Sequence, residues 1–422
     1  MGVGQGVRSA IGWVTDERHA TTVAWLLFAI ALLVRGAGLA ILPNLHLSSN
    51  ARESVIDAAE LIRNGRFLWN PDYPMLIPPL TAMVLAGLQS VFGPGLLAIK
   101  ILQVVLDAAT VVVVFHIGRR SFTYPAAVWG SLALTVYPFT VFVPLYIGTE
   151  ALFTFLLALG LLFFVDGLER GRTLSFVAGG LLLGLATEAR GTTLYLPVFL
   201  LGLLAWRHRR ALSASVARQA VMFLLGFLLI IGPWGARNLV VLGEFIPTSI
   251  PGMPLLYGSS EDFWIISDRR EKLPAYLDHL AKAKGFVFPE RPTWVEKDRL
   301  YKAAAMEKYK ERLREKPLSF VPFLAHKFAR LWYGTESGTN EMIVLLPNLP
   351  IYILALVGLG ATWRSPSAGV QTLHVLLVYI VLLHVAAFAY FRYIAPVMPF
   401  VLLYAAHGLI RLVPGLAPPR PT

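Results

Sequence analysis

The sequence has no cysteine and few charged residues. Without a thiol, this chain of 422 residues can form no disulfide bond, no thiolate metal site and no cysteine nucleophile. Asp, Glu, Lys and Arg together make up 15% of the residues, whereas soluble domains carry roughly a quarter. Hydrophobic residues make up 56% and gather in long runs. The composition therefore excludes an ordinary soluble domain and indicates an all-α polytopic membrane protein.

Several catalytic motifs are also missing. The sequence contains no P-loop, no GxGxxG after a predicted strand, no HExxH and no GxSxG. Three scattered histidines, His326, His384 and His407, are interpreted as structural. The first 20 residues lack the hydrophobic core and cleavage site of a signal peptide, so the first apolar run is predicted to be an uncleaved span. These absences argue against nucleotide-driven pumping by this chain.

The net charge of +12 does not indicate nucleic-acid binding. Much of the Lys and Arg lies in short clusters between apolar runs, which is the pattern of the positive-inside rule. The clusters are Arg119-Arg120, Arg170 with Arg172, Arg207–Arg210, and Arg364. They all fall on the cytoplasmic side if residues 76–93 do not cross the bilayer. We therefore expect 76–93 to lie on the outer surface.

Ten apolar segments are predicted to span the membrane. They are about 22–41, 97–117, 123–143, 149–167, 174–189, 191–206, 219–237, 343–362, 371–390 and 395–413. Both termini are then cytoplasmic. Residues 1–240 form a transmembrane module with a first outer loop at 42–96, residues 241–342 form an outer polar helical region, and 343–422 hold the last spans. Within the polar region we expect a helix at 294–315 and a surface helix at 317–332.

Charged residues inside predicted spans call for partners, because an intramembrane charge is costly. Arg35 lies in the first span and Asp107 in the middle of a later one, so we expect them to pair. Glu188 and Arg190 lie at the turn between two short spans. They either pair with each other or line a water-filled recess that opens to the outside.

The first outer loop contains an amphipathic segment. If residues 52–64 are helical, Glu53, Asp57, Glu60 and Asn64 share one face, whereas apolar residues such as Val55 lie on another. Such a helix lies on the membrane surface. Its carboxylates either face water or form the acidic wall of an active site.

Charged residues of both signs are expected near the outer membrane face. The acidic ones are Glu53, Asp57, Asp72, Glu150 and Glu188, and the basic ones are Arg52, Lys100, Arg190, Arg237 and Arg392. A carboxylate can take the proton of an attacking hydroxyl, and guanidinium groups can hold a phosphate. A donor with a phosphate head and a lipid tail fits that depth. Ion-coupled transporters also collect charges in cavities, so a sugar-lipid or lipid transporter stays an alternative.

A series of motifs along the chain resembles the GT-C membrane glycosyltransferases. The motifs are SSNARESVIDAAELIRNGRF (48–67), IPPL (77–80), GTEALFTFLL (148–157), GLLLGLATEARGTTLYLP (180–197), PWGARN (233–238), the 298–332 stretch and FRYIAPVMPF (391–400). In this order they resemble the bacterial family-39-like enzymes, which are related to protein O-mannosyltransferases and aminoarabinose transferases.

The resemblance implies a GT-C-like bundle of about ten transmembrane helices, with helices on its outer face. It implies a glycosyltransferase that moves a sugar, with inversion, from a polyprenyl-phosphate donor to an acceptor glycan, lipid or protein. The expected setting is a bacterial inner membrane, with the active site facing the periplasm or exterior. We expect no cofactor requirement, although the carboxylates could hold a divalent ion. No ligand spacing demands a metal.

The resemblance also implies a catalytic Asp in the first outer loop, but the matching residue is Asn50. A neutral amide cannot act as a base. Three interpretations stay open. Glu53, or second Asp57, has taken over as the base; the substitution has inactivated the chain; or the protein binds lipid-linked sugars without transferring them.

Roles for the other site residues follow from the same resemblance. Glu150 is expected to orient the acceptor or a metal ion, or simply to favour a helix N-terminus. The donor phosphate is expected to meet a set of basic residues, with Glu188 nearby, unless the arginines only anchor the protein at the membrane interface. Tyr393 either stacks on the sugar or belongs to the aromatic belt. The basic residues are Arg52, Lys100, Arg190, Arg237 and Arg392.

Overall fold

The computed structural model describes residues 11–43, 50–66, 78–260, 273–335 and 340–416. Within these ranges all regular secondary structure is helical. Seven helical segments are long and apolar enough to cross a membrane. They contain α2 (Ala20–Ile41), α5 (Leu97–Ser121), α8 (Glu150–Arg170), α11 (Ala214–Leu242), α16 (Glu341–Thr362), α17 (Ala368–Ala386), and α18 (Phe391–Ile394) with α19 (Met398–Leu412).

An eighth apolar span is bent. The helix α6 (Tyr124–Val136) is followed after one residue by α7 (Pro138–Phe142) and a 3₁₀ turn, at an angle of 52°. The bend falls at Pro138, which has no N–H to continue the ladder and pushes the preceding residue out of the helical region. Eight of the ten predicted spans are therefore long enough to cross, counting this bent pair as one.

The other two predicted spans are short helices, α9 (Thr173–Ala189) and α10 (Leu196–Arg207). At 1.5 Å per residue they measure about 26 and 18 Å, below the roughly 30 Å of a bilayer core. α9 packs between α8 and α11. A Cβ at its Gly180 would overlap the carbonyl oxygen of Phe223, so only glycine permits this backbone contact. α9 therefore packs closely against protein on the sides that face α8 and α11.

An ion pair joins the first span to the core of the bundle. The guanidinium of Arg35, which is completely buried, donates to the carboxylate of Asp107 in α5. It also donates to the carbonyl oxygen of Thr135 at 2.9 Å. The predicted Arg35–Asp107 pair is confirmed. It ties α2 to α5 and to the end of α6, close to the bend.

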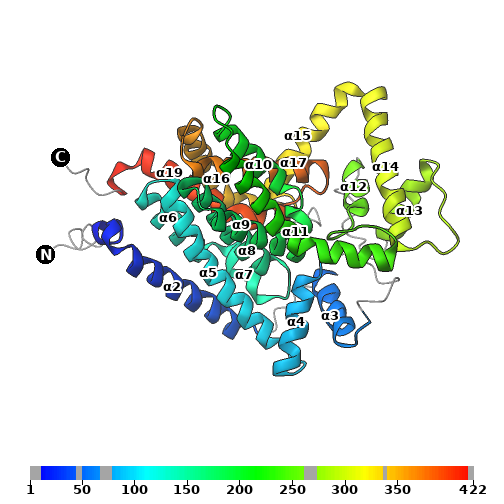
Figure 1. The fold of residues 1–422 in the computed structure, drawn as a ribbon, viewed down its shortest axis with the longest axis horizontal. Coiled ribbons are helices and arrows are strands. Elements are labelled where there is room, and N and C mark those ends of the chain that lie inside the picture. Colours follow the sequence, from blue (N-terminus) through cyan, green and yellow to red (C-terminus); the bar gives the residue numbers. More distant parts are fainter. Residues whose placement is uncertain (1–10, 44–49, 67–77, 261–272, 336–339, 417–422) are drawn as a thin grey trace.

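The basic clusters gather at one end of the bundle. Arg119 pairs with Glu17 at 2.9 Å, and Arg120 pairs with Asp166 at 2.8 Å. Near the end of the chain, Leu416 accepts a hydrogen bond from the indole of Trp129. This end, called the basic end below, contains the start of α2 and the end of α19 (Figure 1). The shared position of the clusters agrees with the sequence analysis.

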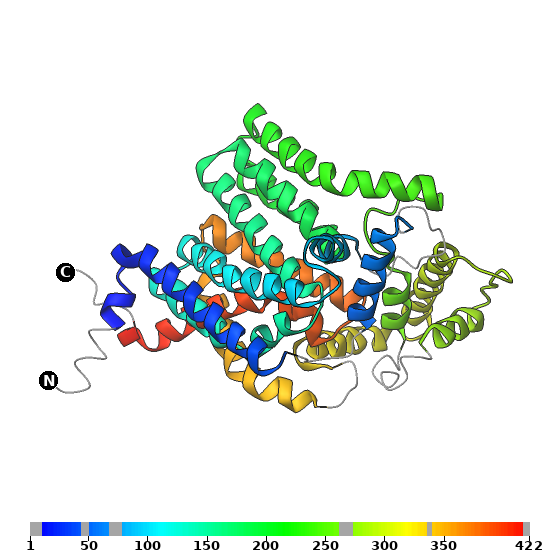
Figure 2. The ribbon, with the colours of Figure 1, turned by 90° about the horizontal axis from the view of Figure 1, so that it is seen from below.

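The opposite end holds the polar helices, as Figures 1 and 2 show from two directions. They are α3 (Asn50–Arg63), α4 (Leu80–Phe92), α12 (Gly252–Ser259), α13 (Leu273–Ala283), α14 (Trp294–Glu315) and α15 (Pro317–Tyr333). The name refers to the end of the molecule that these helices share, because α4 and α12 are themselves mostly apolar. α4 has 13 residues, about 20 Å, which is too short to span and agrees with the surface position expected for 76–93. α14 begins with a capping box of Thr293 and Glu296, and α15 follows at Pro317. Both fall where the sequence predicted helices.

A buried lysine fastens α15 to its neighbours. Lys327 is completely buried, and its amine donates to the carbonyl oxygen of Gly258 at 2.7 Å and to the Tyr309 hydroxyl at 3.2 Å. Tyr309 in turn donates to the carbonyl oxygen of Ala386 at the end of α17, at 2.8 Å. Burial, together with the nearby charge of Arg312, lowers the pKa of Lys327 to about 7. One amine therefore links the polar helices to the bundle.

The Arg35–Asp107 pair gives a first prediction. Asp107→Asn leaves a buried guanidinium without its counter-charge, so we expect the free energy of unfolding to fall by about 3–5 kcal/mol. Reversible unfolding in mixed micelles measures this. The double variant Arg35→Met with Asp107→Leu should lose much less, and Glu17→Gln at an exposed pair should change stability by under about 0.5 kcal/mol. Equal losses in all three variants would contradict the assignment.

Lys327 gives a second prediction, on pH. A lysine in the unfolded chain has a pKa of about 10.4, whereas burial lowers the pKa of native Lys327 to about 7. Between these values the unfolded state binds the extra proton, so the free energy of unfolding should rise with pH from 7 to about 9. Lys327→Met should remove that rise, and Lys310→Met, at an exposed lysine of α14, should keep it. An unchanged slope in Lys327→Met would refute the prediction.

Candidate functional site

Two arginines converge on one buried carboxylate at the end of the bundle that carries the polar helices. Glu150 is the first residue of α8 and is 3% exposed. Its Oε1 lies 3.0 Å from Nε of Arg392 and 3.3 Å from Nη1 of Arg190. Its Oε2 has no hydrogen-bond partner among the described residues. We call Glu150, Arg190 and Arg392 the arginine–glutamate cluster. Two guanidinium groups therefore share one oxygen of a single buried carboxylate.

Arg190 reaches the cluster because α9 ends just before it. The residue has an extended backbone, with φ −157° and ψ 120°, and a 3₁₀ turn follows at Gly191–Thr193. The hydroxyl of Tyr379 donates to the carbonyl oxygen of Thr192 at 2.6 Å and fixes this turn against α17. The guanidinium of Arg190 lies 5.2 Å from the ring centre of Tyr393. Its position is therefore set by α8, α17 and α18 together.

Glu188 does not pair with Arg190, so the interpretation as a Glu188–Arg190 pair is wrong. Glu188 lies in the last turn of α9, whereas Arg190 has already left the helix and contacts Glu150. Glu188 is 5% exposed, and neither carboxyl oxygen has a partner within the described part of the chain. Buried polar groups normally find a partner. Glu188 is therefore a buried carboxyl group that a ligand could bind near the end of α9.

Arg392 and Tyr393 come from the short helix α18. The N–H of Phe391 donates to the carbonyl oxygen of Gly334 at 2.9 Å, which attaches α18 to the end of α15. The ring of Tyr393 stacks on Phe388 at 5.7 Å and on His384 at 5.0 Å. We call these three rings the aromatic stack. The guanidinium of Arg190 lies over the Tyr393 ring, so the aromatic stack adjoins the arginine–glutamate cluster.

His384 is a site residue that the sequence analysis missed. It is 6% exposed, and its Nε2 has no hydrogen-bond partner among the described residues. No spacing signal could have found it, because α17 ends at Ala386 and the chain must turn back to place Tyr393 on His384. Its stacking supports Tyr393, which is compatible with the structural role expected from the sequence.

Two of the predicted phosphate ligands have their described contacts elsewhere. The amine of Lys100 donates to the carbonyl oxygen of Pro43 at 2.5 Å, at the start of the first outer loop. Arg237 donates to the side chain of Asn238 at 2.7 Å and lies 4.9 Å from the ring centre of Trp234. The structure therefore brings Arg190 and Arg392 together and leaves Lys100 and Arg237 outside the arginine–glutamate cluster.

The first outer loop packs beside the cluster through α3. Val55 and Ala59 of α3 belong to the same buried group as Ile147, three residues before Glu150, and Ala58 packs with Trp234 of α11. Asp57 and Glu60 are exposed on the other face, so the predicted amphipathic helix is confirmed. The side chains of Asn50, Arg52 and Glu53, and the whole of Asp72, lie outside the described residues. The catalytic roles of this loop stay predictions.

No group of three His, Asp or Glu side chains within the described ranges could hold a metal ion. Glu53 and Asp72 lie outside these ranges. The expectation about metals and cofactors stays a prediction.

Comparisons with known proteins can now be set beside this geometry. Residues 77–235 match the family model of the dolichyl-phosphate-mannose-protein mannosyltransferases. Among solved structures, the archaeal oligosaccharyltransferase AglB from Archaeoglobus fulgidus, in complex with an inhibitory peptide and a dolichol-phosphate, superposes with a TM-score of 0.53 at 14% identity, over 96% of this chain and 52% of that one. The apo form of the oligosaccharyltransferase from Archaeoglobus fulgidus superposes with a TM-score of 0.53 at 15% identity, over 92% of this chain and 50% of that one. This chain has the GT-C fold.

A third similar structure is ArnT from Cupriavidus metallidurans bound to undecaprenyl phosphate, with a TM-score of 0.40, 17% identity, and coverage of 93% of this chain and 77% of that one. None of the curated proteins matches the sequence. The chain spans about half the length of the oligosaccharyltransferase. The family match includes Glu150 and Arg190 but ends before Arg392. In the folded chain the side chain of Arg392 nevertheless contacts Glu150.

The arginine–glutamate cluster gives the third prediction. Glu150→Gln removes the only carboxylate that faces both guanidiniums in the described structure. Because Arg392 is partly exposed, we expect a loss of about 2 kcal/mol in the free energy of unfolding, less than for a fully buried pair. Glu244→Gln, at the partly exposed pair with Arg299 at the same end of the molecule, serves as the matched control. Unfolding in mixed micelles at neutral pH measures both, and an equal effect would argue against a special role for Glu150.

Proposed function

We propose that the protein is a glycosyltransferase that moves a sugar from a polyprenyl-phosphate donor to an acceptor at the membrane face near the arginine–glutamate cluster. The observation that carries the proposal is the convergence of Arg190 and Arg392 on one buried carboxylate. It lies in a chain with the GT-C fold, beside an aromatic stack. Cation, carboxylate and aromatic surface are the groups that a sugar phosphate requires.

The two arginines suit the phosphate of the donor. A guanidinium offers parallel N–H donors that match phosphate oxygens, and it stays charged at any physiological pH. The side chains of Arg190 and Arg392 are 12% and 31% exposed, so an incoming phosphate would meet charges that are partly shielded from water. The similar oligosaccharyltransferase was solved in complex with a dolichol-phosphate, which supports a lipid-linked phosphate as the ligand class.

The transfer would be a single displacement. The acceptor hydroxyl attacks the anomeric carbon, its proton passes to a carboxylate of the first outer loop, and the bond from the sugar to the phosphate oxygen breaks. The polyprenyl phosphate leaves with the bonding electrons, and Arg190 and Arg392 stabilise its increased negative charge. Glu53 is our first candidate for the base and Asp57 the second, because Asn50 cannot accept the proton. Glu188 and Tyr393 would position the sugar.

The orientation in the membrane is part of the proposal. The basic end of the bundle carries Arg119, Arg120, Arg207 and Arg364, and the positive-inside rule assigns such an end to the cytoplasm. The arginine–glutamate cluster would then face the periplasm or exterior, where the donor lipid exposes its sugar. We expect a multi-pass protein of a bacterial inner membrane.

A non-catalytic GT-C binding protein is the second candidate. The specific observation in its favour is Asn50 at the position where the resemblance implies a catalytic Asp. Such a protein would bind the lipid-linked sugar at Arg190 and Arg392 without transferring it.

The fourth prediction compares transfer by the chain as it stands with transfer by Glu53→Gln, Asn50→Asp and Asp57→Asn. The assay uses proteoliposomes and a panel of polyprenyl-phosphate sugars. If Glu53 is the base, Glu53→Gln should lower turnover by roughly 10²-fold or more, whereas Asp57→Asn should stay near the starting rate.

Arg392→Lys keeps a charge but loses the guanidinium fork, so it should weaken donor binding. Arg299→Lys, at an exposed ion pair at the same end, should not.

The outcomes separate the candidates. Activity of the starting chain that disappears in Glu53→Gln supports the transferase with a relocated base. Turnover only after Asn50→Asp identifies a disabled member of the fold. Donor binding that depends on Arg392 but produces no transfer in any variant favours the binding protein. Movement of the donor across the vesicle membrane without sugar transfer would favour a transporter.

A further inference from the structure

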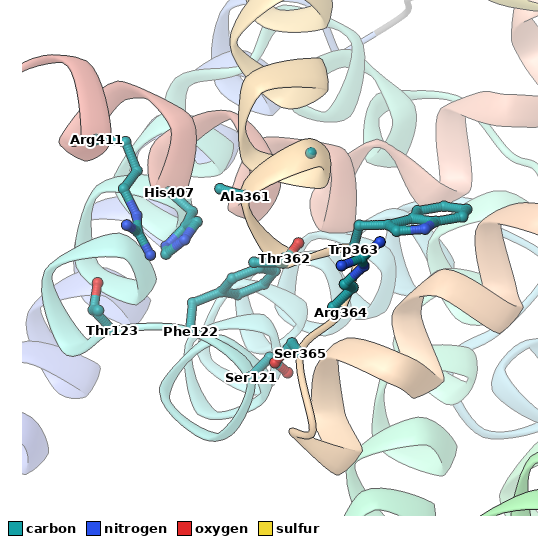
Figure 3. A pocket seen from close by; sticks show the side chains of 11 residues that line it. Ser121, Phe122, Thr123, Ala361, Thr362, Trp363, Arg364, Ser365, His407 and Arg411 are labelled. Carbon is teal, nitrogen blue, oxygen red and sulfur yellow. The ribbon is translucent and has the colours of Figure 1, made fainter.

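The bundle contains a pocket at its basic end, opposite the arginine–glutamate cluster. It has a volume of about 620 Å³, which is the size of a small-molecule site. Three segments line it: residues 121–123 between α5 and α6, residues 360–365 at the end of α16, and His407 with Arg411 on α19. Figure 3 shows Arg411 and His407 on one side of the Phe122 ring and Arg364 on another. Nothing in the proposed transfer reaction uses this pocket.

The lining of the pocket carries positive charge that no acidic residue of the described lining neutralises. Its described lining includes Arg364 and Arg411 but no acidic residue. Neither arginine makes an ion pair or a side-chain hydrogen bond within the described part of the chain. By contrast, Arg119 at this end is matched by Glu17 and Arg120 by Asp166. Two unmatched guanidiniums beside one hollow form an anion site, since each carries N–H donors and a full charge.

A buried histidine supplies an independent sign of a missing ligand. His407 is 6% exposed, and neither of its ring nitrogens has a hydrogen-bond partner among the described residues. Its ring lies 5.3 Å from the Phe122 ring in the pocket wall. The buried hydroxyl of Ser121, another lining residue, is also without a partner there. Buried groups of this kind normally hydrogen-bond, and a bound anion would satisfy both.

The pocket walls are held rigidly. A Cβ at Gly358 would overlap the carbonyl oxygen of Tyr404, and a Cβ at Gly408 would overlap that of Leu354. α16 and α19 therefore touch through their backbones at two points just before the pocket. Their ends, which carry Arg364 and Arg411, diverge from this fixed contact. The folded bundle therefore fixes the backbone positions from which the two arginines extend.

The rim of the pocket is apolar, which favours a lipid over a soluble anion. Trp363 is 69% exposed and Leu412 is 59% exposed, each next to one of the two arginines in sequence. In a membrane protein, exposed apolar side chains at a helix end lie at the lipid interface, and tryptophan is enriched there. A phosphate headgroup could enter between the arginines while its acyl chains remain beside Trp363 and Leu412.

We propose that this pocket binds the phosphate headgroup of an anionic phospholipid from the leaflet at the basic end of the bundle. Basic pockets between transmembrane helices are known sites for such headgroups. Arg364 and Arg411 hold the phosphate, and His407 and Ser121 bond to the oxygens that reach the interior. The bound lipid closes the gap between the ends of α5, α16 and α19 and stabilises the bundle.

The fifth prediction uses native mass spectrometry of the full chain in detergent, with dioleoyl phosphatidylglycerol and dioleoyl phosphatidylcholine as probes. The chain should retain phosphatidylglycerol in preference to phosphatidylcholine. The double variant Arg364→Gln with Arg411→Gln should weaken phosphatidylglycerol binding on the order of tenfold or more. Arg209→Gln, at an exposed arginine of the same end that stacks on Trp206, should bind as the starting chain does. Both substituted residues are exposed, so the variants should fold.

A photoreactive phosphatidylglycerol analogue locates the lipid. Cross-links are expected in residues 360–365 and 407–411, and the double variant should lose them. Equal retention of phosphatidylglycerol by the double variant, or cross-links confined to other segments, overturns the proposal. Inorganic phosphate is the second arm of the test. If a millimolar excess displaces the lipid and itself stabilises the chain, the site belongs to a free phosphate and the lipid assignment is wrong.

Discussion

A charge buried inside a membrane bundle must meet an opposite charge or a ligand, and this constraint organises the structure. Arg35 meets Asp107, and the pair fixes the first span against α5 and the bend after α6. Glu150 meets Arg190 and Arg392, and the three join α8, the end of α9 and α18. The first pair joins one cation to one anion deep in the bundle. In the second group two guanidinium groups share one carboxylate oxygen, and this convergence is the basis of the proposed phosphate site.

The polar helices act on this group through packing rather than through direct contact. α15 touches α18 by the bond from Phe391 to Gly334, and Lys327 links it to α14 and to α12. Tyr390, just before α18, belongs to the small core that the polar helices form with one another. A change in how the polar helices dock, such as acceptor binding would cause, would therefore reach Arg392 within a few residues.

The two ends of the bundle use charge in different ways. At the end with the polar helices, two arginines converge on the buried carboxylate of Glu150. At the basic end, Arg119 and Arg120 are matched by acidic residues, while Arg364 and Arg411 line a pocket. The proposed transfer site and the proposed lipid site therefore lie at opposite ends of the bundle.

The sequence alone determined the features that depend on local residue patterns or on the scarcity of charged residues within apolar spans. Hydropathy predicted ten spans, of which eight are long enough to cross, Pro317 bounded α14, and the rarity of buried charge paired Arg35 with Asp107. The sequence also indicated that the segments of α9 and α10 are short, but it could not show that α9 packs between α8 and α11. Only the tertiary structure decided that Arg190 meets Glu150 rather than Glu188, or that His384 lies under Tyr393. Those contacts join residues far apart in the chain, and packing of whole helices sets them rather than any local propensity.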